Sequence, residues 1–372
     1  MVKNIVVLGS TGSVGVQTLD VVRALPESFR VVGLAAGRNH GLLESQIAEF
    51  RPRMAWADGD AGSLGDAQRV PMEDMVTEPG VDLVMVATTG RTGLGPTLAA
   101  LRAGKGVALA NKEVIVMAGE LVTETARLHG AALLPVDSEP SAIWQCLRGE
   151  EQPVSKLILT ASGGPFRTKP LGEIAGATPG EALAHPTWAM GRKISVDSAT
   201  LMNKGFEVIE CHWLFSVPFD RIDVVVHPQS IVHSMVELAD GSVKAQLGPP
   251  DMRLPIQYAL SYPDRLANAS LPRFGPLDAA SLTFEPLDAE RYPCFPLALE
   301  AGRLGGTYPA VLSAADEVAV HRFLDGRIGF GDIHALVGGV LERHHSDGAA
   351  SLEAVLAADD WARRQMSEAV RA

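Results

Sequence analysis

The chain has 372 residues, a formal net charge of −12 and a hydrophobic content of 47%. Its length predicts two or three domains, and its acidic balance argues against a general nucleic-acid-binding protein, because neutralising phosphates needs clustered lysine and arginine. No apolar run approaches the ~20 residues of a membrane span, and the scattered cysteines, with no CxxC pair, indicate neither a disulfide framework nor a structural zinc site. The first strand is expected by residue 4, which leaves no room for a targeting peptide and favours a cytoplasmic setting.

Short apolar runs alternate with helix-like segments through residues 1–136. The runs are IVVLG, FRVVGLAA, RMAWA, VDLVMVAT, GVALA and AALLPV. Strands that alternate with helices pair in parallel, so the pattern predicts an α/β fold whose N-terminal part is a Rossmann-like, doubly wound parallel sheet. We therefore assign residues 1–136 to a nucleotide-binding domain.

A glycine-rich turn follows the first expected strand, with Gly9, Gly12 and Gly15 spaced GxxGxxG. Such a turn lets backbone N–H groups approach a pyrophosphate at a helix N-terminus, and Ser10, Thr11 and Ser13 would add hydroxyl donors. The alternative is a tight strand–helix turn without a ligand. Because the turn opens a repeating α/β pattern, the nucleotide interpretation is favoured.

The second expected strand ends in Gly37, Arg38 and Asn39. An NAD site usually places Asp or Glu at this point to bind the ribose 2′-hydroxyl. A guanidinium at Arg38 suits a 2′-phosphate instead, so the sequence favours NADPH over NADH.

The pattern changes after Val136. Residues 137–262 contain strand-like runs of a second sheet with antiparallel neighbours, and a Gly- and Pro-rich segment at about residues 163–192 reads as a flap. We predict an α+β catalytic domain here, a linker over residues 263–288 and a small C-terminal helical domain over residues 289–372.

Two acidic stretches predict a metal site. Asp137 and Glu139 stand at i and i+2, and in extended backbone they would point the same way. Downstream, Asn203 and Lys204 lie four and three residues before Glu207, so the three can share one helix face. An all-oxygen set of Asp137, Glu139 and Glu207 suits Mg²⁺ or Mn²⁺. The sequence leaves three alternative third carboxylates open: Asp197, Glu210 and Asp251.

Hydroxyl and cationic side chains surround the same segments. Ser162, Ser198, Asn203 and Lys204 could converge on a phosphate through charge-assisted hydrogen bonds. His185 and Trp188 lie in the flap, where they could close over a substrate and exclude water.

Taken together, these motifs resemble the 1-deoxy-D-xylulose 5-phosphate reductoisomerase family, in order from about residue 4 to residue 333. The matching pieces are LGSTGSVG, AGRN, ANKE, PVDSE, TASGGPF, HPTWAMGRKISVDSATLMNKGFEVIE, HPQSIVHSM, GPPDMR and PAVLSAADEVAVHRFLDGRIGF, of which KISVDSATLMNKG is the most specific. The resemblance implies conversion of 1-deoxy-D-xylulose 5-phosphate to 2-C-methyl-D-erythritol 4-phosphate in the non-mevalonate isoprenoid pathway. It also implies NADPH, a divalent cation (Mg²⁺ or Mn²⁺), a small phosphorylated ketose substrate and a homodimer.

The resemblance carries residue roles with it. Cofactor contacts fall on Thr11, Gly12, Ser13, Val14, Gly37, Arg38, Asn39, Asn111, Glu113 and Gly191, beside the turn residue Gly9. The implied metal ligands are Asp137, Glu139 and Glu207, and the implied catalytic residues are Lys112 and Glu139. Substrate contacts fall on Ser138, Ser162, His185, Trp188, Ser198, Asn203, Lys204 and Met252. The chain departs from the family pattern at Pro140, where members usually have His, and at Thr187 in the flap.

Two other functions would explain part of the pattern. Aspartate-semialdehyde dehydrogenase has a similar turn but needs a catalytic thiolate, and no activating neighbours are evident around Cys146, Cys211 and Cys294. A non-catalytic NADP-sensing protein would keep the glycines and Arg38 but would not need three carboxylates and a phosphate clamp.

Overall fold

The computed structural model describes residues 2–59, 64–152, 154–279, 281–346, 348 and 351–369. The chain divides into two compact units. The first contains Met1–Val114, Val122–Ser141 and Asp251–Arg273, and the second contains Ile115–Leu121, Ala142–Pro250 and Phe274–Ala372. The domain boundaries expected after residues 136, 262 and 288 stay predictions.

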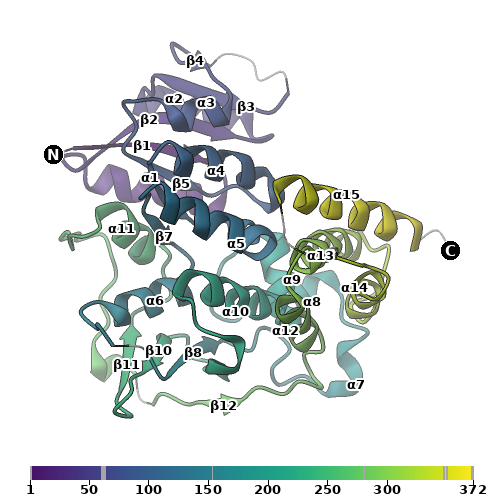
Figure 1. Cartoon of the computed structure of the whole chain (residues 1–372). Helices are drawn as coiled ribbons and strands as arrows, with labels where there is room; N and C mark the ends of the chain where they lie inside the picture. Colours follow the sequence, from purple (N-terminus) through teal and green to yellow (C-terminus); the bar gives the residue numbers. More distant parts are fainter. Residues whose placement is uncertain are drawn as a thin grey trace. The chain divides into compact units, whose positions relative to one another are not determined.

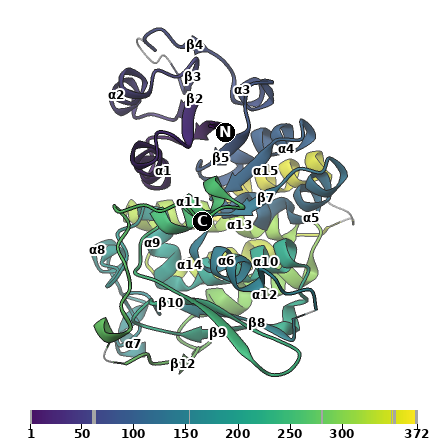
Figure 2. The same ribbon diagram turned by 90° about the vertical axis from the view of Figure 1, so that its left-hand side faces the viewer.

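The first unit is a doubly wound α/β structure. Its strands are β1 (Lys3–Leu8), β2 (Phe29–Ala36), β3 (Met54–Ala57), β4 (Gln68–Arg69), β5 (Leu83–Val86), β6 (Gly106–Leu109) and β7 (Leu133–Pro135). The helices are α1 (Ser13–Ala24), α2 (His40–Phe50), α3 (Met72–Thr77), η1 (Gly90–Gly93), α4 (Leu94–Arg102), α5 (Lys112–Leu128) and α11 (Arg253–Ser261). Figure 2 shows α1 and α2 on one side of the sheet and α3 and α4 on the other.

All seven strands of this sheet pair in parallel, in the order β4-β3-β2-β1-β5-β6-β7. Helices cover both faces, so the strands are buried on both sides, and Ile5 to Leu8 of β1 are fully buried. The strand order reverses at β1, and ligands of such sheets bind at the carboxyl ends of the strands on either side of the reversal. The glycine turn after β1 lies at this point. The predicted Rossmann-like sheet is thereby confirmed.

The second unit is built on a mixed sheet with helices. Its strands are β8 (Lys156–Ala161), β9 (Ile222–Val226), β10 (Val232–Glu237), β11 (Val243–Leu247) and β12 (Glu285–Pro286), in the order β11-β10-β8-β9-β12. The pairs β10–β11, β8–β10 and β9–β12 run antiparallel, as predicted for the α+β part, whereas β8 and β9 run parallel, which was not predicted. The helices are α6 (Ser138–Leu147), α7 (Leu171–Ile174), α8 (Pro179–Leu183), α9 (Arg192–Thr200), α10 (Met202–Phe215), η2 (Phe219–Arg221), η3 (Pro276–Asp278), α12 (Cys294–Leu304), α13 (Tyr308–Leu324), α14 (Asp332–Glu342) and α15 (Leu352–Ala369).

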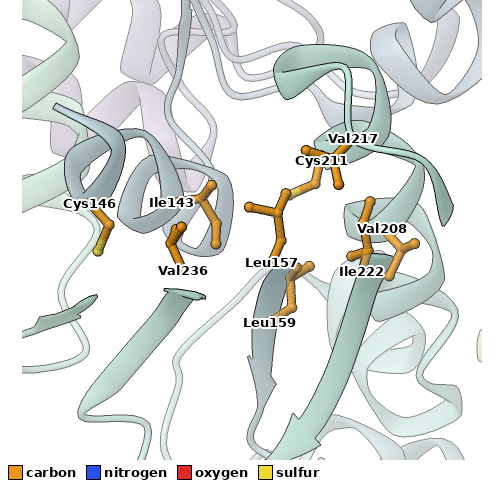
Figure 3. Close-up of a cluster of buried hydrophobic side chains, with 9 residues drawn as sticks. All are labelled: Ile143, Cys146, Leu157, Leu159, Val208, Cys211, Val217, Ile222 and Val236. Carbon is orange, nitrogen blue, oxygen red and sulfur yellow. The ribbon is translucent and has the colours of Figure 1, made fainter. Parts of the chain in front are cut away.

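One hydrophobic cluster joins this sheet to its helices (Figure 3). Leu157 and Leu159 of β8 pack with buried side chains of α6, α10, β9 and β10 and of the loop after α10: Ile143, Cys146, Val208, Cys211, Val217, Ile222 and Val236. Because one face of α10 packs on this sheet, the positions of the residues on the other faces of α10 are fixed relative to β8.

The expected flap and the C-terminal helices complete the second unit. The segment predicted to be irregular contains the short helices α7 and α8. At the start of this segment, the Tyr292 hydroxyl donates a hydrogen bond to the Gly163 carbonyl at 2.7 Å. The helix α13 packs against α12, α14 and α15 (Figure 1), which confirms the C-terminal helical region. Among the described residues, no helix is both long and apolar enough to cross a membrane.

The cluster in Figure 3 predicts a large effect at Leu157. Leu157→Ala should lower the free energy of unfolding by about 2–5 kcal/mol, because it removes buried methyl groups and leaves a cavity against α10. Urea unfolding followed by circular dichroism measures the change. Leu247→Ala on β11, where the leucine is 39% exposed, is the matched control and should change stability by less than about 0.5 kcal/mol. Equal losses in the two variants would contradict the assigned core.

Candidate active site

The glycine turn leaves no room for side chains. Gly9 has φ +83°, and a Cβ on it would lie 2.3 Å from the Ala87 carbonyl oxygen. A Cβ on Gly15 would lie 2.2 Å from the Gly9 carbonyl oxygen, so α1 starts directly against the turn. Gly12 is the N-cap of α1 and is exposed, as is Ser13. The first N–H groups of α1, from Ser13 and Val14 onward, therefore form an exposed helix N-terminus of the kind that binds phosphate.

Ser10 does not serve the turn as expected. It is fully buried, its hydroxyl donates to Gln46 Oε1 at 2.7 Å, and Gln46 Nε2 donates back to the Ser10 carbonyl at 2.9 Å. The expectation that Ser10 offers a hydroxyl to a ligand is therefore wrong, because that hydroxyl ties the turn to α2. The hydroxyls of Thr11 and Ser13 remain at the surface.

The segment after β2 is exposed at Gly37, Arg38 and Asn39. Asn39 caps α2, since its side-chain oxygen accepts from the Leu42 N–H at 3.3 Å. Within the described parts of the chain, the Arg38 guanidinium has no ion pair or hydrogen bond. This cation is thus available at the sheet edge where the 2′-phosphate was expected.

Asn111 follows β6 at the same sheet edge and is 2% exposed. Its side-chain nitrogen donates to Thr88 Oγ1 at 3.1 Å and to the Gly90 carbonyl at 2.9 Å, which fixes the orientation of the amide. The amide oxygen is buried and accepts no hydrogen bond from the described residues. A buried acceptor left open in this way fits a hydrogen-bond donor of a bound ligand. The other two expected cofactor residues stand at helix starts: Glu113 in the first turn of α5 and Gly191 as the N-cap of α9.

Lys112 and Asp137 form a nearly buried ion pair. The Lys112 ammonium lies 2.5 Å from Asp137 Oδ2, and the two side chains are 7% and 12% exposed. Burying a carboxylate is costly unless a cation accompanies it, so the Lys112 ammonium offsets the charge of Asp137 and holds the carboxylate in place.

Glu139 lies near Asp137, but the backbone that joins them differs from the one expected. The helix α6 begins at Ser138, so the extended backbone assumed for Asp137 and Glu139 is wrong. Instead, the Ser138 N–H donates to Asp137 Oδ1 at 3.1 Å and the Ser138 hydroxyl donates to Glu139 Oε2 at 2.5 Å. Pro140 lies in the first turn of α6, where a missing N–H breaks no helical hydrogen bond, so the helix accommodates this departure from the family pattern.

The predicted helix face on α10 is confirmed. Asn203 Nδ2 donates to Glu207 Oε1 at 2.6 Å, and the Lys204 ammonium pairs with Glu207 Oε2. Glu207 is 1% exposed and Lys204 3%. Ahead of these residues, Leu201 has φ +54° and turns the chain between α9 and α10. Ser198 of α9 stands before this turn, and Asn203 and Lys204 of α10 stand after it.

Three carboxylates gather as the sequence predicts. One ligand oxygen each from Asp137, Glu139 and Glu207 lies within 4.8 Å of the other two, a grouping that could hold a metal ion. Two of the alternative third ligands are engaged elsewhere: Asp197 pairs with Lys193 at 2.6 Å and Asp251 with Arg253 at 2.5 Å. Glu210 is buried on α10 and does not belong to the three-carboxylate grouping found among the described residues.

Ser162 and His185 form a directed pair. His185 Nδ1 accepts the backbone N–H groups of Thr187 at 3.1 Å and Trp188 at 2.9 Å, so in the neutral ring the hydrogen sits on Nε2. Nε2 then donates to the Ser162 hydroxyl at 2.9 Å, and the Gly164 N–H donates to the same oxygen at 3.1 Å. With two donors already on its oxygen, Ser162 keeps its own hydrogen for an acceptor.

Gly164 also brings the loop of Ser162 against α9. It has φ +63°, and a Cβ there would lie 2.7 Å from the Ser198 carbonyl oxygen. Ser198 itself is 7% exposed. The structure thereby places Gly164, two residues after Ser162 in the TASGG motif, against the backbone of Ser198.

Trp188 and Met252 are the remaining predicted substrate residues. The Trp188 ring lies 6.2 Å from the ring of His233, measured between centroids, while Met252 stands as the N-cap of α11. His233 was not singled out from the sequence. In the sequence, His233 is a histidine inside a strand-like run. Such histidines are also common in ordinary protein cores, so this pattern did not indicate a functional site.

The cysteines do not supply a nucleophile. All three are buried, and burial raises the pKa of Cys146 and of Cys294. A reactive cysteine needs a lowered pKa and access to substrate, so the dehydrogenase alternative that depends on a thiolate loses its central requirement.

A doubly wound nucleotide-binding sheet in a chain that also gathers three carboxylates defines a nucleotide- and metal-dependent oxidoreductase. Family models described as 1-deoxy-D-xylulose 5-phosphate reductoisomerase match residues 5–119, its C-terminal domain residues 133–215, and the DXP reductoisomerase C-terminal domain residues 247–365. The chain belongs to the 1-deoxy-D-xylulose 5-phosphate reductoisomerase family.

Relatives and solved structures agree with this family over the whole length. The reductoisomerase of Pelotomaculum thermopropionicum is 53% identical and that of Heliobacterium modesticaldum 52%, each match covering at least 98% of both chains. A reductoisomerase crystal structure with NADPH, fosmidomycin and magnesium has a TM-score of 0.95 at 37% identity, covering 100% of this chain and 98% of that one. The Zymomonas mobilis enzyme with NADPH has a TM-score of 0.90 at 42% identity, covering 100% and 99%.

The network around His185 predicts a pH dependence of stability. Burial lowers the pKa of His185 below its usual 6.5, so on acidification the unfolded chain takes up a proton before the folded one does. The stabilisation by neutral His185 should be complete above about pH 6.5 and should be lost as the pH falls from there towards the lowered folded pKa. The measurement is the difference in unfolding free energy between wild type and His185→Gln from pH 8 to pH 5. His129→Gln, at an exposed position, is the control. A difference that stays constant or grows on acidification would exclude a His185 that is held neutral by burial in the folded protein.

Proposed function

We propose that this chain converts 1-deoxy-D-xylulose 5-phosphate to 2-C-methyl-D-erythritol 4-phosphate with NADPH and a divalent cation. The observation that carries the proposal is the approach of Asp137, Glu139 and Glu207 to within 4.8 Å in a member of this family. Related structures that contain NADPH, fosmidomycin and magnesium support the same assignment.

The nucleotide edge of the first sheet fits NADPH. The cradle of Gly9 and Gly15 tolerates no side chain, and the open acceptor of Asn111 suits a donor on the cofactor. The residues that would hold it are Gly9, Thr11, Gly12, Ser13, Val14, Gly37, Arg38, Asn39, Asn111, Glu113 and Gly191. When bound, NADPH supplies the hydride that reduces the rearranged aldehyde.

The carboxylate group fits Mg²⁺ or Mn²⁺, because both prefer oxygen ligands. Asp137, Glu139 and Glu207 would be the ligands, and the cation, when bound, polarises the neighbouring carbonyl and hydroxyl oxygens of the ketose. Lys112 keeps Asp137 in place and can offset negative charge that develops on a substrate oxygen. Ser138 fixes one oxygen of Glu139 by its hydroxyl, so the carboxylate does not have to reorganise during the reaction.

The phosphate of the substrate would be bound by Ser162, Ser198, Asn203 and Lys204. Neutral His185 orients Ser162 with its hydrogen outward, towards an acceptor. Binding at this remote group fixes the position of the reacting carbons and reduces the entropic cost of reaching the transition state. Trp188 on the flap and Met252 would cover the substrate and exclude water from the aldehyde.

A homodimer and a cytoplasmic setting complete the proposal. The family resemblance supports the homodimer, and the scattered, buried cysteines are consistent with a reducing compartment. The net charge of −12 supports a small-molecule substrate rather than nucleic acid.

NADPH oxidation with the phosphoketose, with and without EDTA, tests the reaction. Wild type should turn over with Mg²⁺ or Mn²⁺ and lose activity in EDTA. Glu207→Gln should lower kcat/KM by about 100-fold or more while NADPH still binds, because one charged ligand is lost. Glu210→Gln, on the same helix, is the control and should retain most activity. Full activity of Glu207→Gln would refute the third ligand, and wild type that binds NADPH without turnover would favour a sensor.

The charge after β2 predicts cofactor selectivity. Arg38→Asp should weaken NADPH binding by about 10- to 100-fold, because a charge-assisted contact to the 2′-phosphate is replaced by repulsion, while NADH binding changes little. Fluorescence titration measures both dissociation constants. Arg30→Asp, an exposed arginine near the opposite end of β2, makes the same charge change and should leave both constants nearly unchanged. Equal losses for the two nucleotides at Arg38 would reject the 2′-phosphate role.

A further inference from the structure

Lys193 joins three helices of the second unit. It lies near the start of α9, and its ammonium is 2.6 Å from Asp197 Oδ2 on the same helix and 2.9 Å from Asp316 Oδ2 on α13. The same ammonium lies 4.9 Å from the ring centroid of Phe206 on α10. A single cation is thus in contact with α9, α10 and α13.

The two acids at Lys193 are among the most deeply buried charges of the protein. The side chains of Asp197 and Asp316 are 3% and 0% exposed, and that of Lys193 is 18% exposed. Two carboxylates brought together in an apolar interior repel each other and lose hydration, so they stay close only with a cation next to them. A buried ion pair of this kind adds little to stability beyond what apolar side chains could supply, and its attested use is to specify one geometry.

The helices held by Lys193 carry the predicted phosphate-binding residues. Ser198 directly follows Asp197 on α9. Phe206 on α10 stands between Lys204 and Glu207. The left-handed Leu201 joins the two helices, so Lys193 contacts both sides of this bend.

The support continues into the C-terminal helices. Next to Asp316 on α13, Glu317 pairs with Arg363 of α15 at 2.8 Å, and Arg363 pairs with Asp359 at 2.7 Å. The helix α15 therefore holds α13 by charged groups as well as by apolar packing.

We propose that Lys193 is a positioning residue for the substrate phosphate. By holding α9 against α13 and α10, it sets the distance between Ser198 and the Asn203–Lys204 start of α10. This inference rests on the proposed function, since it assigns the phosphate to those residues. A misplacement of about 1 Å at such a site is enough to cost a large factor in binding or rate.

The test compares full-length Lys193→Met and Asp316→Asn with wild type. Two readouts report on the phosphate site: the KM for the phosphoketose, and the rise in Tm caused by inorganic phosphate, which needs no catalysis. A third readout, the Kd for NADPH, reports on the cofactor site. Lys156→Met is the matched control, because Lys156 makes an exposed ion pair with Asp223 at 2.8 Å on the sheet of the same unit.

Lys193→Met should raise the KM about tenfold or more and abolish the Tm rise from phosphate, with the Kd for NADPH within about twofold of wild type. Asp316→Asn should change the same two readouts in the same direction by a smaller factor, and Lys156→Met should change none. If Lys193→Met does not fold, Asp316→Asn decides by the same criteria.

Unchanged KM and phosphate protection in a folded variant would overturn the proposal and leave a purely structural ion pair. An equal loss of NADPH affinity would also overturn it, because the residue would then support the unit as a whole. A wild type that is protected by phosphate but does not turn over the phosphoketose would refute the proposed function, while the phosphate readout would still decide the role of Lys193.

Discussion

The repulsion among three carboxylates is the constraint on which the site depends. Asp137, Glu139 and Glu207 approach one another within 4.8 Å, a distance at which like charges in a partly buried setting oppose each other strongly. Lys112 beside Asp137 and Lys204 beside Glu207 offset two of these charges. The charge of the third carboxylate, Glu139, gives the group a net negative charge, which favours binding of a cation. Both lysines are almost fully buried, so the polar side chains around the acids are fixed before any ligand arrives.

Two histidine rings provide a second kind of fixed polar contact. His185 accepts the backbone N–H groups of Thr187 and Trp188 on one nitrogen and donates to Ser162 with the other. His227 does the same at 0% exposure: its Nε2 accepts from Ile231 and Val232, and its Nδ1 donates to the Thr283 carbonyl. In each case the ring accepts hydrogen bonds from two successive backbone N–H groups and so holds the loop in one conformation. Orientation, more than added stability, is what such contacts contribute.

Much of the fold was predictable because its strands are buried on both faces. A parallel sheet covered by helices requires unbroken apolar runs, and the six runs seen in residues 1–136 became β1, β2, β3, β5, β6 and β7. The two-residue β4 and the short helix α3 were not predicted, because so few residues show no periodicity. The short helices α7 and α8 inside the predicted flap were not predicted for the same reason. The order of the strands in the second sheet and the parallel pairing of β8 with β9 likewise depend on long-range contacts, which no local pattern encodes.

The sequence by itself determined the features that depend on residues close together in the chain. The glycine spacing of the nucleotide turn, and the pairing of Asn203 and Lys204 with Glu207, follow from backbone geometry and from the helix period. Tertiary structure alone decided which acids gather at one site and which cations distant in the sequence pair with them. Lys193 of α9 pairs with Asp316 of α13, and Lys112 of α5 pairs with Asp137. Asp137 and Glu139 come together through the start of α6 instead of a strand. The physical reason is that local geometry repeats with the backbone, whereas the partner of a buried charge is set by the packing of segments far apart in the chain.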